Sequence, residues 1–180
     1  MEPVVVAVHK DEEHRFSKIR HQSLTLLEGL GVEGDAHCGV TVQHRFDQEK
    51  DPLRPNLRQV HLIQTELLDE VNAKGFHVQP GDLGENISTR GLDVLNLPAG
   101  TRLIIGEHAT LEVTGLRNPC INIELFQKGL LAQVGERRPG GTYLRKTGVM
   151  SIVVRGGVVR EGDRIVVVLP AGEHVPLKPV

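Results

Sequence analysis

The sequence has 180 residues, of which 39% are hydrophobic and 24% are charged, and its formal net charge is -2. This length favours one domain with a substantial core, and the composition is that of a globular protein. With balanced charge, one Tyr, no Trp and no apolar run near the ~20 residues that cross a bilayer, neither nucleic acid nor a membrane is an expected partner.

The N-terminal stretch does not have the pattern of a secretory signal. In "MEPVVVAVHKDEEH" an acidic residue stands where a secretory signal would carry positive charge, and the short apolar run is soon followed by charge. We therefore expect a cytoplasmic chain in which Cys38 and Cys120 are free thiols, because reducing compartments disfavour disulfides. A bridge between these two cysteines is the less favoured alternative.

Along the chain, seven short runs predict strands and two longer patterns predict helices. The strand runs cover residues 4–9, 22–27, 58–64, 101–106, 109–116, 148–154 and 163–169. One helix is predicted over 65–74, with Thr65 as its N-cap and Gly75 just past its end. A second is predicted from about Pro119, with apolar residues at helical spacing as far as Val134. Because strands are many and helices few, we expect a mainly β (β-rich α+β) fold, a barrel or strongly curved sheet with helices at its edges.

Two segments lack a sustained pattern. Residues of about 41–58 are polar and carry two prolines, which predicts a flexible loop that either covers a site or is surface decoration. Residues 170–180 are predicted to form an extended tail. The expected organisation is a single domain over 1–180, with its core at about 4–169.

Three glycine-containing loops gather the polar side chains that could form a site. They are "GVEGDAHCG", "PGDLGENIS" and "GLRNPC", and glycine lets a backbone turn sharply or approach a ligand closely. Their candidate residues are Asp35, His37, Cys38, Asp82, Glu85, Asn86, Arg117, Asn118 and Cys120. Each loop alone is equally compatible with an ordinary turn.

Cys120 has the most specific local chemistry. If Asn118 caps the second helix and Pro119 is its first residue, Cys120 lies in the first turn, where the helix dipole and Arg117 favour the thiolate. A thiolate is a nucleophile and a soft metal ligand. The alternative is a small side chain packed in the core, and the local sequence leaves both open.

The remaining patterns exclude some sites and suggest one more. There is no CxxC, HExxH, Walker or GxGxxG motif, so a zinc enzyme, a nucleotide hydrolase and a dinucleotide dehydrogenase are not indicated. The stretch "GERRPGGTYLRKTG" carries Arg137, Arg138, Arg145 and Lys146. These side chains could hold an anionic ligand, since arginine binds phosphate through paired hydrogen bonds, or could form a solvated surface loop.

Four stretches, in order, resemble the MOSC domain, named after the C-terminal domain of molybdenum cofactor sulfurases. They are "GVEGDAHCG", "RQVHLIQTE", "PGDLGENISTRGLDVLNLPAGTRLIIGEHATLEVTGLRNPC" and "GVVREGDRI", within a likeness that runs from about Val4 to Leu169. The resemblance implies a MOSC-type β-barrel with a few flanking helices, whose ligand is the molybdenum cofactor (molybdopterin), a phosphate-bearing pterin that holds the metal through a dithiolene. The sulfurases carry a separate pyridoxal phosphate domain, and no pyridoxal phosphate site is expected within this chain.

The resemblance also assigns residues. The cysteine of the family's Arg-x-Pro-Cys segment, a proposed sulfur carrier or molybdenum ligand, falls on Cys120, so Cys120 is the expected metal ligand and, with Arg117 and His37, the expected catalytic group. Cys38 has no expected role. The residues expected to bind the cofactor are Asp35, His37, Glu85, Asn86, Arg117, Asn118, Arg137, Arg138 and Arg145.

Three functions follow from the resemblance. The leading hypothesis is a small molybdenum-cofactor-dependent oxidoreductase that reduces N-hydroxylated or N-oxide compounds with electrons from a separate donor. The second is a persulfide carrier, or sulfurtransferase, that receives sulfur on Cys120 from a separate cysteine desulfurase. The third is a module that binds or delivers the cofactor without turnover. A cysteine hydrolase in which His37 activates Cys120 has the weakest support.

Overall fold

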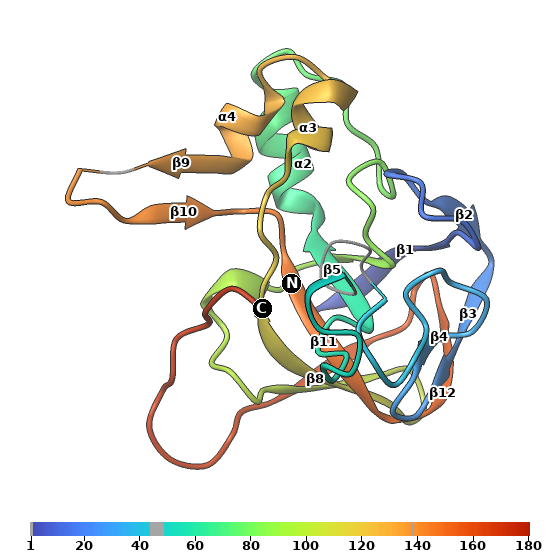
Figure 1. The fold of residues 1–180 in the computed structure, drawn as a ribbon. Helices are drawn as coiled ribbons and strands as arrows, with labels where there is room; N and C mark the ends of the chain where they lie inside the picture. Colours follow the sequence, from blue (N-terminus) through green and yellow to red (C-terminus); the bar gives the residue numbers. More distant parts are fainter. Residues whose placement is uncertain (1, 44–48, 138) are drawn as a thin grey trace.

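An eight-stranded, largely antiparallel sheet forms the body of the protein in the computed structural model, which describes residues 2–43, 49–137 and 139–180 (Figure 1). β5 and β6 are its parallel pair. In spatial order the strands are β13 (Ile165–Val168), β7 (Arg102–Ile105), β8 (Ala109–Leu116), β11 (Val149–Arg155), β5 (Val60–Gln64), β6 (Ile87–Arg90), β1 (Val4–Lys10) and β2 (Ile19–His21).

Two smaller sheets accompany it. One contains β12 (Gly157–Arg160), β3 (Ser23–Leu27) and β4 (Gly31–Val32), and its inner face packs against the large sheet. The other is a hairpin of β9 (Gly135–Arg137) and β10 (Tyr143–Arg145), which projects from the body (Figure 1).

The main core lies between the large sheet and the three-stranded sheet. Along β8 buried and partly exposed residues alternate, which is the pattern of a strand with one face on a core. The fully buried side chains include Leu24, Leu62, Ile87, Leu103 and Leu111. The predicted strand at 109–116 therefore buries the face that its alternation marks, whereas β5 is buried on both faces.

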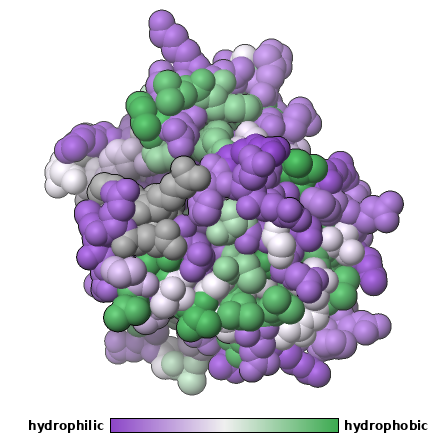
Figure 2. Space-filling model, turned by 45° about the vertical axis from the view of Figure 1, so that its right-hand side comes forward, coloured by the Kyte–Doolittle hydropathy of each residue, from purple (hydrophilic) through white to green (hydrophobic). Residues whose placement is uncertain are grey.

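The helices form a layer over one end of the sheet (Figure 1). This layer contains α2 (Thr65–Asn72), α3 (Ile121–Phe126) and α4 (Leu130–Val134), and a 3-10 turn, η1 (Val94–Asn96), lies elsewhere. Ile63, Leu67, Ile123 and Leu130 belong to a second core beneath the layer. Figure 2 shows a mostly hydrophilic face, with apolar side chains gathered near the top, where the helices lie, and along the lower edge.

Two details of the predicted helices are wrong. Thr65 is the first residue of α2 and not its N-cap, and its Oγ1 donates to the Thr89 carbonyl oxygen at 3.0 Å. The second helix is not continuous, because Gly129 has a φ of +86° and separates α3 from α4. A left-handed residue cannot continue a right-handed helix, so the apolar spacing is kept across two short helices.

The mainly β class with a few helices is confirmed, but a closed barrel is not. Within the described residues the sheet is open, with β13 and β2 at its ends. Its curvature brings Val5 near the turn before β13, where the Val5 N–H donates to the Asp163 carbonyl oxygen at 2.9 Å. Register shifts in β1 and β11 mark the bulges that bend these strands.

Two further findings bear on the sequence expectations. In the described part of the chain, no helix is long and apolar enough to cross a membrane. Cys38 and Cys120 are both free thiols, as predicted.

Candidate functional site

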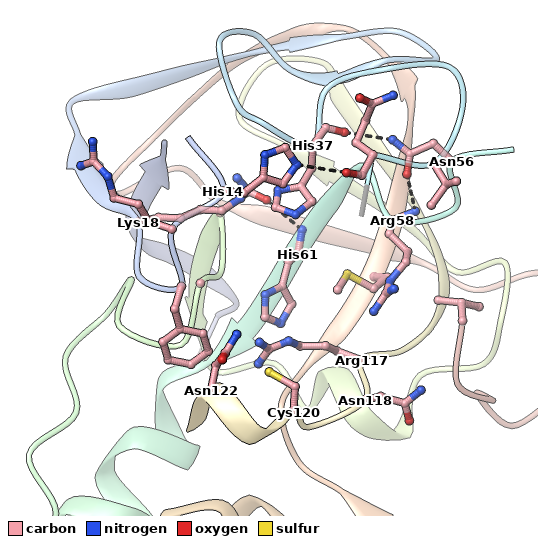
Figure 3. Close-up of a pocket in the computed structure, with 18 of the residues that line it drawn as sticks. His14, Lys18, His37, Asn56, Arg58, His61, Arg117, Asn118, Cys120 and Asn122 are labelled. Carbon is pink, nitrogen blue, oxygen red and sulfur yellow. Dashed lines mark hydrogen bonds between the residues drawn. The ribbon is translucent and has the colours of Figure 1, made fainter. Parts of the chain in front are cut away.

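A cavity of about 540 Å³ opens where the β8–α3 loop meets the ends of β5 and β11 (Figure 3). Such a volume suits a small organic ligand. None of its described lining residues is Asp or Glu, so the lining is cationic. The basic side chains are Arg15, Lys18, Arg54, Arg58 and Arg117, together with His14, His37 and His61.

Cys120 lies at the floor of this cavity, below the Arg117 guanidinium group (Figure 3). The residue is partly exposed and is itself the N-cap of α3, with φ −123° and ψ 166°. The expectation that Asn118 caps the helix and that Cys120 lies in its first turn is therefore wrong. The extended backbone at Cys120 directs the loop from β8 past the cavity before the helix begins at Ile121.

Arg117 is a buried cation of the cavity, with 9% of its surface exposed. Burial lowers the pKa of the guanidinium group, and the charges of Cys120 and Glu85 oppose this effect. Its Nη1 is buried and has no hydrogen-bond partner among the described residues. Because buried donors are nearly always paired in native proteins, this nitrogen indicates a place for an acceptor that comes from outside the chain.

Asp35 is the centre of a buried hydrogen-bond network behind the cavity wall. Its Oδ1 accepts from the backbone N–H of His37 at 2.9 Å and from His37 Nδ1 at 3.2 Å. Its Oδ2 accepts from Lys18 Nζ at 2.7 Å and from Asn86 Nδ2 at 3.0 Å. Burial acts to raise the pKa of Asp35, but the bonds from His37 and Lys18 outweigh it and hold this pKa well below its usual range.

His37 therefore has a fixed orientation. With Nδ1–H directed at Asp35, its other ring nitrogen is left for the cavity that the residue lines. The His14 ring lies beside it, with centroids 5.2 Å apart (Figure 3). Burial lowers the pKa of His37 more than the bond to Asp35 raises it, so the ring is neutral at pH 7.

Asn86 and His61 form the wall between His37 and Arg117. Asn86 is 1% exposed, and its side-chain oxygen accepts from the His61 backbone N–H at 3.1 Å. His61 Nε2 donates to the Thr147 carbonyl oxygen at 2.7 Å, and burial lowers the His61 pKa well below 6.5. In Figure 3 the His61 side chain stands between the His14–His37 pair and Arg117. The structure thus brings Cys120, His37 and Asn86 to one cavity.

The glycines of "PGDLGEN" make room for another wall segment, residues 14–18. A Cβ atom at Gly84 would lie 2.5 Å from the Phe16 carbonyl oxygen, and one at Gly81 would lie 2.9 Å from that of Lys18. The Lys18 N–H donates to the Gly81 carbonyl oxygen at 2.9 Å. Both glycines also have positive φ. Glycine is therefore required at these two positions for two reasons, the backbone conformation and the close approach of the segment 14–18.

Sequence analysis missed this wall segment, because it is irregular and carries no motif. The residues missed there are His14, Arg15, Phe16 and Lys18. It also missed Arg54, Asn56 and Arg58, which line the cavity from the segment predicted to be a loop at 41–58, and His61 within a predicted strand. Residues 44–48 of that loop lie outside the described residues.

Several predicted site residues lie away from the cavity lining. Glu85 is fully buried behind it, where its Oε1 accepts from Gly81 N–H at 2.6 Å and from Ser88 Oγ at 2.8 Å. Burial raises the pKa of Glu85. Asp82 Oδ2 accepts from the Gln79 N–H at 2.7 Å and so stabilises a turn.

The described arginines of the predicted basic loop also lie outside the cavity lining. Arg137 is an exposed residue of the β9–β10 hairpin, and Arg138 lies outside the described residues. Arg145 Nε donates at 2.6 Å to the side-chain oxygen of Asn118, which does line the cavity. Arg145 therefore supports the Cys120 loop from behind, while the cavity cations come from other segments.

Cys38, for which no role is expected, is also outside the cavity lining, and burial raises the pKa of its thiol. Among the described residues, no group of three or more His, Cys, Asp or Glu side chains is arranged to hold a metal ion.

Comparison with known proteins adds a family and a fold. A family model for the MOSC domain matches residues 30–166. The crystal structure of APC1665, the YUAD protein from Bacillus subtilis, is 27% identical with a TM-score of 0.74, over 93% of this chain and 96% of that one. The YiiM structure from Escherichia coli is 23% identical with a TM-score of 0.63, over 97% and 73%, and indicates a shared fold. Among curated proteins there is no match.

Proposed function

We propose that this chain, which belongs to the MOSC domain family, binds the molybdenum cofactor in the cavity beside Cys120 and reduces small N-hydroxylated or N-oxide compounds. The observation that carries the proposal is the buried Nη1 of Arg117, which has no hydrogen-bond partner in the described part of the chain and lies in the same cavity as a free thiol. This pair offers a soft metal ligand and a donor for anionic oxygen within one pocket.

The residues present fit such a group. A cofactor that carries phosphate and a metal–dithiolene centre needs cationic donors and room for a flat organic ring. The cavity supplies Arg117, Arg58 and Arg54 in a volume of about 540 Å³. The thiol of Cys120 would be the metal ligand, and these arginines would hold the anionic end of the cofactor.

When bound, the cofactor supplies a metal centre that accepts oxygen and exchanges electrons with a separate donor. The chain supplies position and protons. Reduction of an N–OH group to N–H consumes two electrons and two protons and releases one water. His37 is suited to carry one proton, because Asp35 holds its Nδ1–H and leaves the other ring nitrogen as the site of proton uptake and release. Lys18, bound to the same carboxylate, holds Asp35 in its ionised form.

The test is metal and pterin analysis of protein made in a host with an intact cofactor pathway. We expect molybdenum and pterin in the wild type, loss of both in Cys120→Ala, and retention in Cys38→Ala, which is a matched control because Cys38 does not line the cavity. Reduction of an N-hydroxylated compound with a reduced viologen dye should follow the metal content.

The cofactor content and the reductase activity together distinguish a reductase from a sulfur carrier and from a delivery module. Cofactor retained by Cys120→Ala would contradict the role of Cys120 as metal ligand. Wild-type protein without cofactor, but with cyanide-releasable sulfur on Cys120, would replace the proposal by sulfur carriage. Cofactor bound at full occupancy without reduction of any N-hydroxylated compound would indicate a delivery module.

A further inference from the structure

Residues 175–180, here called the strap, run past Ala99 and the end of β8 and reach the cavity at Val180. The Ala99 N–H donates to the Val175 carbonyl oxygen at 2.9 Å, and the Leu116 N–H donates to that of Lys178 at 2.8 Å. The Val180 N–H in turn donates to the Leu116 carbonyl oxygen at 3.3 Å. Leu177 also packs against the main core. The strap is therefore held by backbone pairing and by an apolar anchor.

Gly115 in β8 makes this path possible. A Cβ atom there would collide with the Lys178 carbonyl oxygen and would lie 2.5 Å from Val180 Cγ1. The φ of Gly115 is not positive, so conformational freedom does not require glycine at this position. The crossing of the strap is what excludes a side chain there.

The strap reaches the cavity at its last residue. Val180 lines the cavity, and so does Met150, which pairs with Gly115 across β8 and β11. Leu116, which makes two hydrogen bonds with the strap, directly precedes Arg117. The strap thus contributes a wall and also holds the strand end from which the Arg117–Cys120 loop departs.

We infer that the strap is a specificity element, in which Val180 limits the size of molecules that reach Cys120. This inference rests on the cavity and is independent of the proposed cofactor. A side chain at the cavity wall excludes bulky molecules more than small ones. Changing its volume should therefore alter the ratio of reaction rates of a large and a small reagent at the same thiol.

The experiment measures alkylation of Cys120 in a Cys38→Ser background, with iodoacetamide as the small reagent and fluorescein maleimide as the bulky one. Peptide mass spectrometry confirms the modified residue. We expect deletion of residues 176–180 to raise the bulky-to-small rate ratio about tenfold, the effect of about 1.4 kcal/mol on one barrier. Gly115→Ala, which displaces the strap, should act in the same direction.

Single substitutions keep the test valid if the deletion unfolds the protein. Val180→Ala should raise the ratio and Val180→Trp should lower it, whereas general loosening of the fold would raise it in both. Val175→Ala is the matched control, because Val175 is 55% exposed and does not line the cavity, and its ratio should equal that of the parent. Equal ratios in the parent and both Val180 variants would overturn the inference.

Discussion

Lys18 Nζ lies 2.7 Å from Asp35 Oδ2, and the two side chains are 5% and 0% exposed. This buried ion pair joins the wall segment 14–18 to the loop that carries His37. Because Asn86 donates to the same carboxylate oxygen, the pair also orients the wall beside His61. One carboxylate therefore fixes three elements of the cavity.

Removing the charge of Asp35 should destabilise the protein more than removing the charge of Lys18. Asp35→Asn leaves the buried Lys18 without its counter-charge, and we expect a loss of about 3–5 kcal/mol in the free energy of unfolding. Lys18→Met leaves Asp35 with its hydrogen bonds from His37 and Asn86, so the expected loss is about 1–2 kcal/mol. Urea denaturation at pH 7 measures both. A larger loss in Lys18→Met would contradict the assignment of Asp35 as the centre of the network.

Arg117 should matter more for ligand binding than for stability. Its Nη1 has no partner in the described structure, so Arg117→Met removes a buried charge together with its desolvation penalty. We expect the free energy of unfolding to change by no more than about 1 kcal/mol, while the molybdenum and pterin content falls at least tenfold, or about 1.4 kcal/mol in binding. Retention of full cofactor content by a folded Arg117→Met protein would show that other groups hold the anion.

Gly84 should be intolerant of a side chain. Gly84→Ala combines a φ of +83° with a contact of 2.5 Å to the Phe16 carbonyl oxygen, and we expect it to destabilise the fold by about 2–4 kcal/mol and to shift the wall segment. Gly162→Ala is the control, because Gly162 has a φ of +86° and its added Cβ would meet no described atom within 4 Å. This variant should lose about 1–2 kcal/mol in the free energy of unfolding. Thermal unfolding compares the two. Equal losses of stability in the two variants would mean that the close approach of the Phe16 carbonyl oxygen does not add to the cost of a side chain at Gly84.

His9 should make stability fall in acid. Its ring is buried, and neither nitrogen has a hydrogen-bond partner among the described residues. Burial, reinforced by the charges of Arg20, Lys18 and His21, lowers its pKa from 6.5 to about 4. As pH falls from 6.5 to about 4, His9 binds a proton in the unfolded chain but stays neutral in the folded protein. The free energy of unfolding therefore decreases, by up to about 3 kcal/mol.

His9→Leu should remove this part of the pH dependence. The urea midpoint of the variant, measured at pH 7.5 and pH 4.5, should fall less than that of the wild type. His37 and His61, whose pKa values are also lowered, retain some acid sensitivity in both proteins. An identical fall in variant and wild type would show that His9 does not titrate as described.

The sequence by itself determined the strand-rich class, because alternation along runs such as 109–116 reports which face a strand buries. Ordered motifs likewise indicated a resemblance to the MOSC family, and that resemblance implied a shared pocket for Cys120, His37 and Asn86. Helix boundaries were less well determined. Gly129 breaks the second helix, and Cys120 became its N-cap, because backbone conformation at single residues depends on the packing around them.

Only the tertiary structure decided which charges face the cavity. Arg54 and Arg58 line the cavity. Arg137 and Arg145 carry the same charge but do not line it, because Arg137 is exposed on the hairpin and Arg145 binds Asn118 from behind. Lys18 and Val180 belong to irregular segments without motifs, and they reach the cavity because Gly81, Gly84 and Gly115 leave room for the crossing backbone. Local sequence encodes the hydrophobic pattern and the backbone preference of each segment. Which distant segments come together at the cavity depends on how the whole sheet curves.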